Sequence, residues 1–349
     1  MSGRPDTAGP ATSAERRRRM LITALGRDIA AAMRDSQVTE IMVNPDGALR
    51  LDRLGEGRID TGARIEPDQV ERIIRLVASH VRAEVHAEHP ILSAELPPHI
   101  EGCAGERFEG VLPPVSSAPC FSIRKPATRL HTLDDYIADG LMSEVQADAL
   151  RAAVAQRCNI LVAGGTSSGK TTLANALLAE MAPKHSGLDS RVILIEDTRE
   201  LQCPLPDTVA LRTRPPHVSM TELVRSTMRL RPDRIVVGEV RGPEALDMLK
   251  AWNTGHPGGI ATVHANSAIA ALYRIEQLCQ ETVVTVPRQL IAEAIDIIVF
   301  ISGRGIDRRV SMIARVAGLD PDTGAYALAD LPKPNPPKPN LPQSSPKET

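Results

Sequence analysis

Aromatic side chains are scarce in this chain of 349 residues, which contains 3 Phe, 3 Tyr and 1 Trp. Proteins that bind single-stranded nucleic acid stack successive bases on aromatic rings, and this composition offers few such rings. The formal net charge is −2, so the chain as a whole has no electrostatic attraction to nucleic acid or to an anionic membrane. We therefore expect no direct binding of nucleic acid.

Long apolar segments and paired cysteines are also missing. The apolar run from Leu290 to Ile301 is interrupted by Glu293 and Asp296, which excludes a membrane-spanning helix there. No signal peptide opens the sequence, and no C-x-x-C pair suggests zinc or a redox centre. We expect a cytoplasmic protein whose five cysteines are reduced thiols, namely Cys103, Cys120, Cys158, Cys203 and Cys279.

Hydrophobic residues make up 42% of the chain, which is enough for the cores of two domains. Changes of composition divide it into a disordered arm at 1–19, an amino-terminal α/β domain at 20–128, a linker at 129–142, a second α/β domain at 143–331 and a disordered Pro-rich tail at 332–349. The arm ends in four arginines, 16–19, before a helix that we expect to begin near Met20. This run is either a solvated helix start or a surface for acidic lipid or a partner.

Hydrophobic periodicity predicts the elements of the first domain. A strand beginning at Thr39 runs into an Asn-Pro-Asp-Gly turn, and a return strand follows through Leu49 and Leu51. Helical spacing places Val70, Ile73, Ile74 and Val77 on one face of a helix over 67–80. Further strands of this domain are expected at 91–96, 108–112 and 120–123. After it, a hydrophilic linker helix is expected at 134–139, and a second helix at 143–156 leads into the first strand of the second domain.

The second domain alternates strands with helices, and its strands are expected at 159–163, 192–195, 209–212, 235–237 and 259–263. This alternation is typical of a parallel sheet that is covered by helices. Ligands of such sheets bind at the carboxyl ends of the strands.

A phosphate-binding loop follows the first of these strands. The segment reads Gly164, Gly165, Thr166, Ser167, Ser168, Gly169, Lys170, Thr171, Thr172, which fits Gly-x-x-x-x-Gly-Lys-Thr between a strand and a helix. Glycines let successive backbone N–H groups turn toward an anion, and the helix N-terminus adds its dipole. We expect Lys170 to reach the β- and γ-phosphates and the Thr171 hydroxyl to ligate Mg²⁺.

Acidic residues end two other predicted strands. Glu196 is the first candidate to orient or deprotonate the attacking water, and Glu200 is its competitor, because phosphoryl transfer needs a positioned nucleophile. Alternatively, these acids only cap the segment that follows. Glu239 is the second acidic group, and because it follows a glycine it fits water-mediated metal binding or polarisation of the water better than direct ligation.

Arginines and histidines accompany these acids. Arg229, Arg231 and Arg241 flank the Glu239 strand and could neutralise phosphate charge or pair with the carboxylates. His256 and His264 surround a glycine-rich turn and a short strand. Either histidine could be structural, or a neutral imidazole could sense the γ-phosphate or hold a catalytic Glu.

Four motifs in order resemble the Walker A, Asp or Glu box, Walker B and His box of the type II and type IV secretion ATPases. They are GGTSSGKT, IEDTREL, RLRPDRIVVGEVR and TGHPGGIATVHAN, and they span about 159–266. The segments EIMVNPDG and FSIRKP are similar to those of the conjugal-transfer branch of this family, the TrbB type, so the resemblance reaches from about Val38 to Ala329.

The resemblance implies a RecA-like P-loop NTPase domain of α/β class, preceded by a smaller α/β domain. It implies a homo-hexamer in which the amino-terminal domain closes over ATP, with Arg124 on the strand that approaches the phosphates. The function expected is ATP hydrolysis with Mg²⁺ that energises a conjugative or type IV secretion channel at the inner membrane, with peripheral membrane contact left open. The alternatives are a RecA-like nucleic-acid motor or helicase, a pilus assembly or retraction ATPase, and a nucleotide-gated scaffold.

Overall fold

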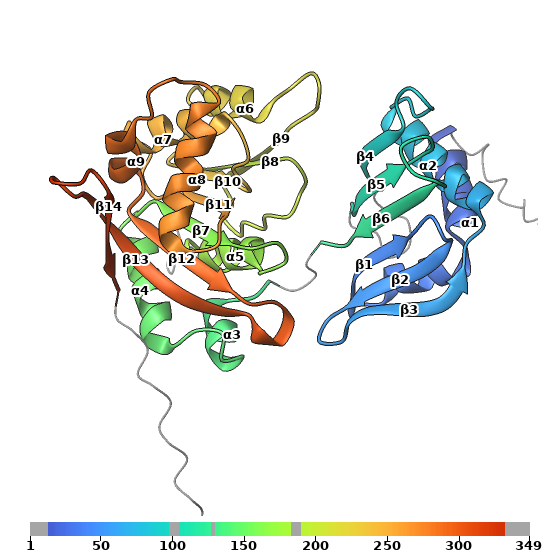
Figure 1. Ribbon diagram of the computed structural model, residues 1–349, viewed down its shortest axis with the longest axis horizontal. Coiled ribbons are helices and arrows are strands. Elements are labelled where there is room, and N and C mark those ends of the chain that lie inside the picture. Colours follow the sequence, from blue (N-terminus) through green and yellow to red (C-terminus); the bar gives the residue numbers. More distant parts are fainter. Residues whose placement is uncertain (1–12, 98–104, 127–129, 183–189, 332–349) are drawn as a thin grey trace, which may run out of the picture. The chain divides into compact units, whose positions relative to one another are not determined.

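The computed structural model describes residues 13–97, 105–126, 130–182 and 190–331, and they form two compact units (Figure 1). The first unit takes in the described residues up to Leu130 together with Glu196–Gln202 and Leu211–Met220. The second takes in the remainder from His131 onward. Residues 1–12 of the predicted arm, Cys103 and the tail at 332–349 lie outside the described residues.

An antiparallel sheet of six strands forms the first unit, in the order β3-β2-β1-β6-β5-β4. Its strands are β1 (Val38–Val43), β2 (Ala48–Arg53), β3 (Gly57–Arg64), β4 (Ile91–Glu95), β5 (Arg107–Val111) and β6 (Cys120–Arg124). Its helices are α1 (Ser13–Arg34) and α2 (Pro67–Val81). The strands and the helix expected from the sequence at these places are confirmed.

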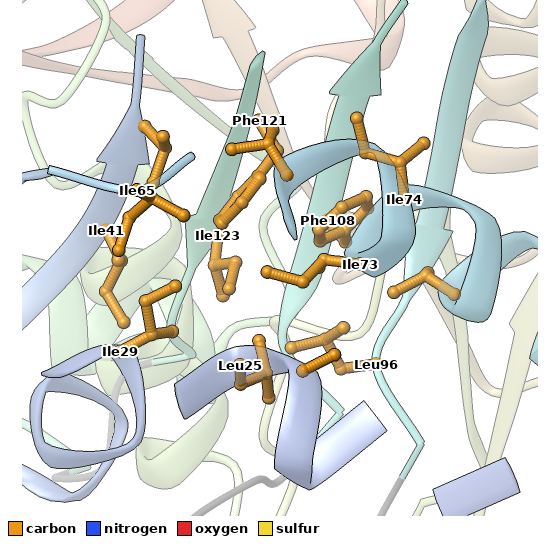
Figure 2. Packing of buried hydrophobic residues seen from close by; sticks show 14 of the residues in the cluster. Leu25, Ile29, Ile41, Ile65, Ile73, Ile74, Leu96, Phe108, Phe121 and Ile123 are labelled. Carbon is orange, nitrogen blue, oxygen red and sulfur yellow. The ribbon is translucent and has the colours of Figure 1, made fainter. Parts of the chain in front are cut away.

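The core of this unit lies between one face of the sheet and the two helices. Side chains point in opposite directions along a strand, so alternate residues of β1, β5 and β6 face α1 and α2. Figure 2 shows these residues packed on the helices. The cluster includes Leu25, Ile29, Ile41, Ile73, Ile74, Phe108, Phe121 and Ile123. All four apolar residues that helical spacing assigned to one face of α2 are buried.

The first helix begins at Ser13, earlier than the start near Met20 that the sequence suggested. The arginine run therefore lies within α1, and Arg17 Nη1 donates a hydrogen bond to Ser13 Oγ at 2.7 Å. Arginine is a good helix former, and Glu15 in the first turn complements the helix dipole, which explains the earlier start. The segment is kinked at Gly26, whose φ of 72° is not helical. Within the described ranges, no helix combines the length and apolar character needed to cross a bilayer.

An eight-stranded sheet forms the second unit, in the order β14-β13-β12-β7-β11-β10-β8-β9. The run β12-β7-β11-β10-β8 is parallel, and β13 and β14 extend it as antiparallel strands. The strands are β7 (Ile160–Gly164), β8 (Val192–Glu196), β9 (Thr208–Arg212), β10 (Arg234–Val237), β11 (Ile260–His264), β12 (Ile297–Ser302), β13 (Arg309–Leu319) and β14 (Tyr326–Asp330). The expected parallel sheet and the α/β class are confirmed.

Helices accompany this sheet on its faces (Figure 1). They are α3 (Leu133–Ala138), α4 (Glu144–Ala155), α5 (Lys170–Glu180), α6 (Met220–Thr227), α7 (Glu244–Asn253), α8 (Ala268–Gln280) and α9 (Arg288–Ala294). Although α3 lies in a hydrophilic stretch, its Leu133 and Tyr136 are buried and the helix contacts α4 and α5. Trp252 of α7 is buried too, and its Nε1 donates to Ile235 O at 3.0 Å.

Asn159, just before β7, joins three segments of this unit through its side chain. Its Oδ1 accepts hydrogen bonds from the backbone N–H groups of Gly258 at 2.8 Å and Gly259 at 2.9 Å. Its Nδ2 donates to Ala294 O at 2.8 Å. These bonds fix the turn before β11 and the end of α9 against the start of β7.

Candidate nucleotide-binding site

The phosphate loop leaves the sheet at Gly164, the last residue of β7, and enters α5 at Lys170. Gly164 pairs with His264 of β11 on one side and with Ile301 of β12 on the other. A Cβ at Gly164 would lie 2.8 Å from Ile301 O, so only glycine fits between the strands. Gly169 has a φ of 88°, a left-handed conformation that favours glycine.

Lys170 extends back over this loop from the first turn of α5. Its Nζ donates to Gly165 O at 3.0 Å and lies 3.2 Å from His264 Nδ1. The side chain is mostly buried, with 7% relative exposure. The ammonium group is thus held where the helix N-terminus and the loop backbone create a positive site.

Glu239 and His264 come together at the carboxyl ends of neighbouring strands. Glu239 follows β10 closely, and His264 is the last residue of β11. Arg241 Nη2 donates to Glu239 Oε2 at 2.6 Å, and His264 Nε2 lies 2.8 Å from Glu239 Oε1. The His264 contact is at ion-pair distance without hydrogen-bond alignment, so the buried Oε1 has no hydrogen-bond donor.

The charges around this pair set its protonation. Burial alone would raise the pKa of Glu239, but the hydrogen bond and charge of Arg241, with smaller contributions from His264 and Lys170, hold that pKa below its ordinary value. Burial lowers the pKa of His264, and although Glu239 opposes this, Lys170 and Arg241 add to the lowering. At neutral pH, Glu239 is therefore ionised and His264 is neutral, with Nδ1 facing the Lys170 ammonium as an acceptor.

Glu196 has a different environment at the end of β8. Its buried Oε1 accepts hydrogen bonds from the backbone N–H groups of Glu200 at 2.9 Å and Leu201 at 2.7 Å. Burial raises the pKa of this carboxyl, and the two backbone hydrogen bonds offset part of the effect. One oxygen of Glu196 thus caps the following segment, as the alternative interpretation of the sequence had it. The catalytic roles of Glu196 and Glu200 remain predictions.

Two of the arginines predicted for the site lie before β10, at the end of the strand opposite to Glu239. Arg229 and Arg231 are exposed and precede β10, whereas Glu239 follows β10. Within this chain, β10 therefore separates them from Glu239, and of the three arginines it is Arg241 that pairs with that carboxylate. The sequence grouped the three because they are close along the chain, but a strand carries its two ends to opposite edges of a sheet.

The two histidines are divided in the same way. His256 precedes β11, and its Nδ1 lies 3.3 Å from Ala251 O at the end of α7. His264 ends β11 and faces Lys170 and Glu239. Of the two histidines, His264 lies at the phosphate-loop edge of the sheet, and a role of His256 at the nucleotide stays a prediction.

Arg124 ends β6 in the first unit, where it is exposed and lies across from Glu40 and Arg107 on the neighbouring strands. Its approach to the phosphates remains a prediction.

Thr171 is the residue predicted to bind Mg²⁺, and it stands in the first turn of α5 beside Lys170. Across the described ranges, no three His, Cys, Asp or Glu side chains are grouped as metal ligands. Mg²⁺ in nucleotide sites generally keeps several waters and is bound through substrate phosphates with one or two protein oxygens. Thr171 would supply the protein oxygen.

Sequence reasoning missed Arg308, which lies beside Gly169 at the start of α5. A Cβ placed on Gly169 would be 2.7 Å from Arg308 Nη1. No motif marks this arginine, because it comes from the segment between β12 and β13, far from the phosphate loop in the sequence.

Comparison with known proteins gives consistent results. The Type II/IV secretion system protein family matches residues 73–307. The chain is 48% identical over 300 residues to the conjugal transfer protein TrbB of Rhizobium radiobacter, covering 86% of this chain and 90% of that protein. It is 37% identical over 312 residues to the type IV secretion system protein PtlH of Bordetella pertussis, covering 78% and 88%.

Solved structures show the same fold. The ATPase DotB of Legionella pneumophila has a TM-score of 0.56 at 20% identity, over 85% of this chain and 78% of that one. The pilus retraction motor PilT with bound ADP has a TM-score of 0.56 at 19% identity, over 86% and 80%.

Proposed function

This chain belongs to the Type II/IV secretion system protein family, and from this membership and its site we propose that it is a hexameric ATP hydrolase that energises conjugative transfer. The TrbB relative is named for conjugal transfer and aligns over nearly its whole length, which supports that process rather than another use of the fold. The proposed partners are the channel proteins of the transfer machinery at the inner membrane.

The observation that carries the proposal is the joint placement of Lys170, His264 and Glu239 beside the phosphate loop. Two of the partners of Lys170 are a carbonyl oxygen and a neutral imidazole, both of which are weaker partners for an ammonium group than a phosphate is. We expect the β- and γ-phosphates of ATP to draw Nζ away from His264. Nucleotide binding then changes the contacts of the histidine that also touches Glu239.

Glu239 is suited to position the attacking water. Its Oε2 is held by Arg241, and its buried Oε1 lacks a hydrogen-bond donor and is ionised. A buried carboxylate oxygen without a donor readily accepts a hydrogen bond from water. Mg²⁺, when bound at Thr171 and the phosphates, supplies neutralisation of the charge on the phosphoryl oxygens. This chain contributes the cradle, the Lys170 cation and the orientation of the water.

The proposal is tested by steady-state release of phosphate from ATP by the purified full chain, with and without single-stranded DNA. We expect magnesium-dependent hydrolysis that DNA does not stimulate. The Lys170→Ala variant should lack this hydrolysis, so its rate serves as the background value. Hydrolysis that rises with DNA would favour a nucleic-acid motor. Equal rates for the wild type and Lys170→Ala would refute the site.

A further inference from the structure

Arg308 places a second cation at the start of α5. It follows the short 3₁₀ turn Gly305–Asp307 and directly precedes β13. A Cβ on Gly169 would lie 2.7 Å from its Nη1 and 3.0 Å from its Cδ, so the stem and the guanidinium of Arg308 pass directly over Gly169. The arginine occupies the space that any side chain at Gly169 would need.

The surroundings of Arg308 hold its guanidinium without neutralising it. Its Cζ lies 5.9 Å from the centre of the Tyr136 ring, which is within the range of a cation–π contact. Tyr136 is 1% exposed, and the ring of His131 packs edge-on against it at 6.4 Å. In the part of the chain that the structure describes, no carboxylate forms an ion pair with Arg308, and its buried Nε has no hydrogen-bond acceptor.

Two more polar atoms in this small cluster are buried without a partner, namely Tyr136 Oη and His131 Nδ1. Native proteins pair nearly all buried polar atoms, so a cluster of unpaired ones indicates a missing ligand or water. The unpaired cation stands at the N-terminal end of α5, where anions bind. An anion at this helix end would pair with the guanidinium of Arg308.

We propose that Arg308 binds the nucleotide, donating from its guanidinium to oxygens of the phosphates that remain in ADP. This inference rests on the proposed function and adds a residue to its site. The order of the strands supports the choice of phosphates. Arg308 follows β12, which flanks β7 on one side, whereas Glu239 and His264 belong to the opposite side through β11 and β10. Arg308 thus approaches the phosphate loop from the side of β7 opposite to Glu239, the residue that we propose positions the attacking water.

The test is the Kd of Mg-ADP, and of a non-hydrolysable Mg-ATP analogue, measured by titration calorimetry on the full chain. Arg308→Gln keeps a polar side chain over Gly169 but removes the charge. The Kd values for ADP and for the ATP analogue should both rise by the same factor, about tenfold or more, as expected for loss of a charged hydrogen bond. Arg304→Ala is the matched control, because this exposed arginine lies in the same segment, and its Kd values should equal those of the wild type.

Thermal melting separates binding from folding. If Arg308→Gln does not fold, Arg308→Lys replaces it, and its Kd should also exceed that of the wild type because an ammonium lacks the planar fork. A wild-type Kd for ADP in a folded variant overturns the inference, and so does a loss confined to the ATP analogue. If Lys170→Ala loses binding while Arg308→Gln retains it, only the Arg308 inference fails. If Lys170→Ala binds normally, the proposed site itself fails.

Discussion

At the scale of single residues, Glu239 shows how a partly buried carboxyl keeps its charge. Desolvation favours the neutral acid, and the charge-assisted hydrogen bond from Arg241 outweighs it. We expect Glu239→Gln to retain nucleotide binding and to lower kcat by about a hundredfold or more, because the amide keeps the shape but cannot accept a proton. Binding is measured by calorimetry and kcat by phosphate release.

Glu196→Gln is the matched comparison for this prediction. Glu196 already uses Oε1 to accept two backbone hydrogen bonds, and an amide oxygen can accept the same bonds. If Glu196 mainly caps the loop, its Gln variant should keep most of the turnover. A larger loss of kcat in Glu196→Gln than in Glu239→Gln would exchange their roles.

His264 gives the site a dependence on pH. Its pKa is below the ordinary 6.5, so the folded site keeps the imidazole neutral at a pH where the unfolded chain takes up a proton. The contribution of this group to stability is therefore complete above pH 6.5 and falls as the pH drops below that value toward the folded pKa. Turnover should fall with further acidification, because a protonated, cationic His264 would form an ion pair with Glu239 and weaken that carboxylate as an acceptor for the attacking water.

The profile of kcat against pH checks this expectation. His264→Gln cannot titrate, so its profile should lack the acidic fall that we attribute to His264. His80→Gln is the control, since burial and the charges of Arg17 and Arg18 also lower the pKa of His80, which lies in the first unit. An unchanged acidic fall in His264→Gln would assign the dependence to another group.

At the scale of elements, hydrophobic periodicity predicted the helices and strands that bury one face and expose the other. The alternation of β6 and the helical spacing of α2 are visible in the sequence because each element buries one face. β3 was not predicted, since most of its residues are exposed and it lacks an apolar face. Similarly, the predicted α1 began too late, because the run of four arginines was interpreted as part of a solvated arm, although arginine favours helix.

The site was predictable where strand ends carry contiguous motifs and unpredictable where the fold joins distant segments. Lys170 and Glu239 follow from their motifs. Placing Arg229 and His256 at the other ends of their strands required knowing where β10 and β11 begin and end. Arg308 could not be found at all, because its position depends on the pairing of β12 with β7.

Asn159 provides a test of how the elements of the second unit are tied together. Asn159→Ala removes three hydrogen bonds and leaves the buried N–H groups of Gly258 and Gly259 without an acceptor. We expect the free energy of unfolding to fall by about 2–4 kcal/mol, measured by urea denaturation. Asn253→Ala, at the exposed end of α7, should change it by less than about 0.5 kcal/mol. Equal effects of the two variants would contradict the role given to Asn159.

At the scale of the whole molecule, the proposed ring makes assembly depend on nucleotide. Whatever binds the assembled state preferentially stabilises it, so Mg²⁺ and a non-hydrolysable ATP analogue should promote the hexamer. Light scattering should then show a species of about six times the 37.6 kDa chain mass, and activity per chain should rise with protein concentration.

A chain that is truncated after Leu331 should still assemble, because the Pro-rich composition of the tail is not that of a packing segment. A monomer whose activity is independent of concentration would defeat the ring and leave the ATPase site intact.

The position of the few aromatic residues has a spectroscopic consequence. Trp252, the one tryptophan of the chain, and the three tyrosines, Tyr136, Tyr273 and Tyr326, all belong to the second unit. Intrinsic fluorescence therefore reports on the second unit alone. Because the Trp252 indole is buried and bonded to Ile235 of β10, its emission should shift to longer wavelength when water reaches this sheet. Unfolding of the first unit should pass unseen in fluorescence while circular dichroism records it, so the two signals together resolve the order in which the units unfold.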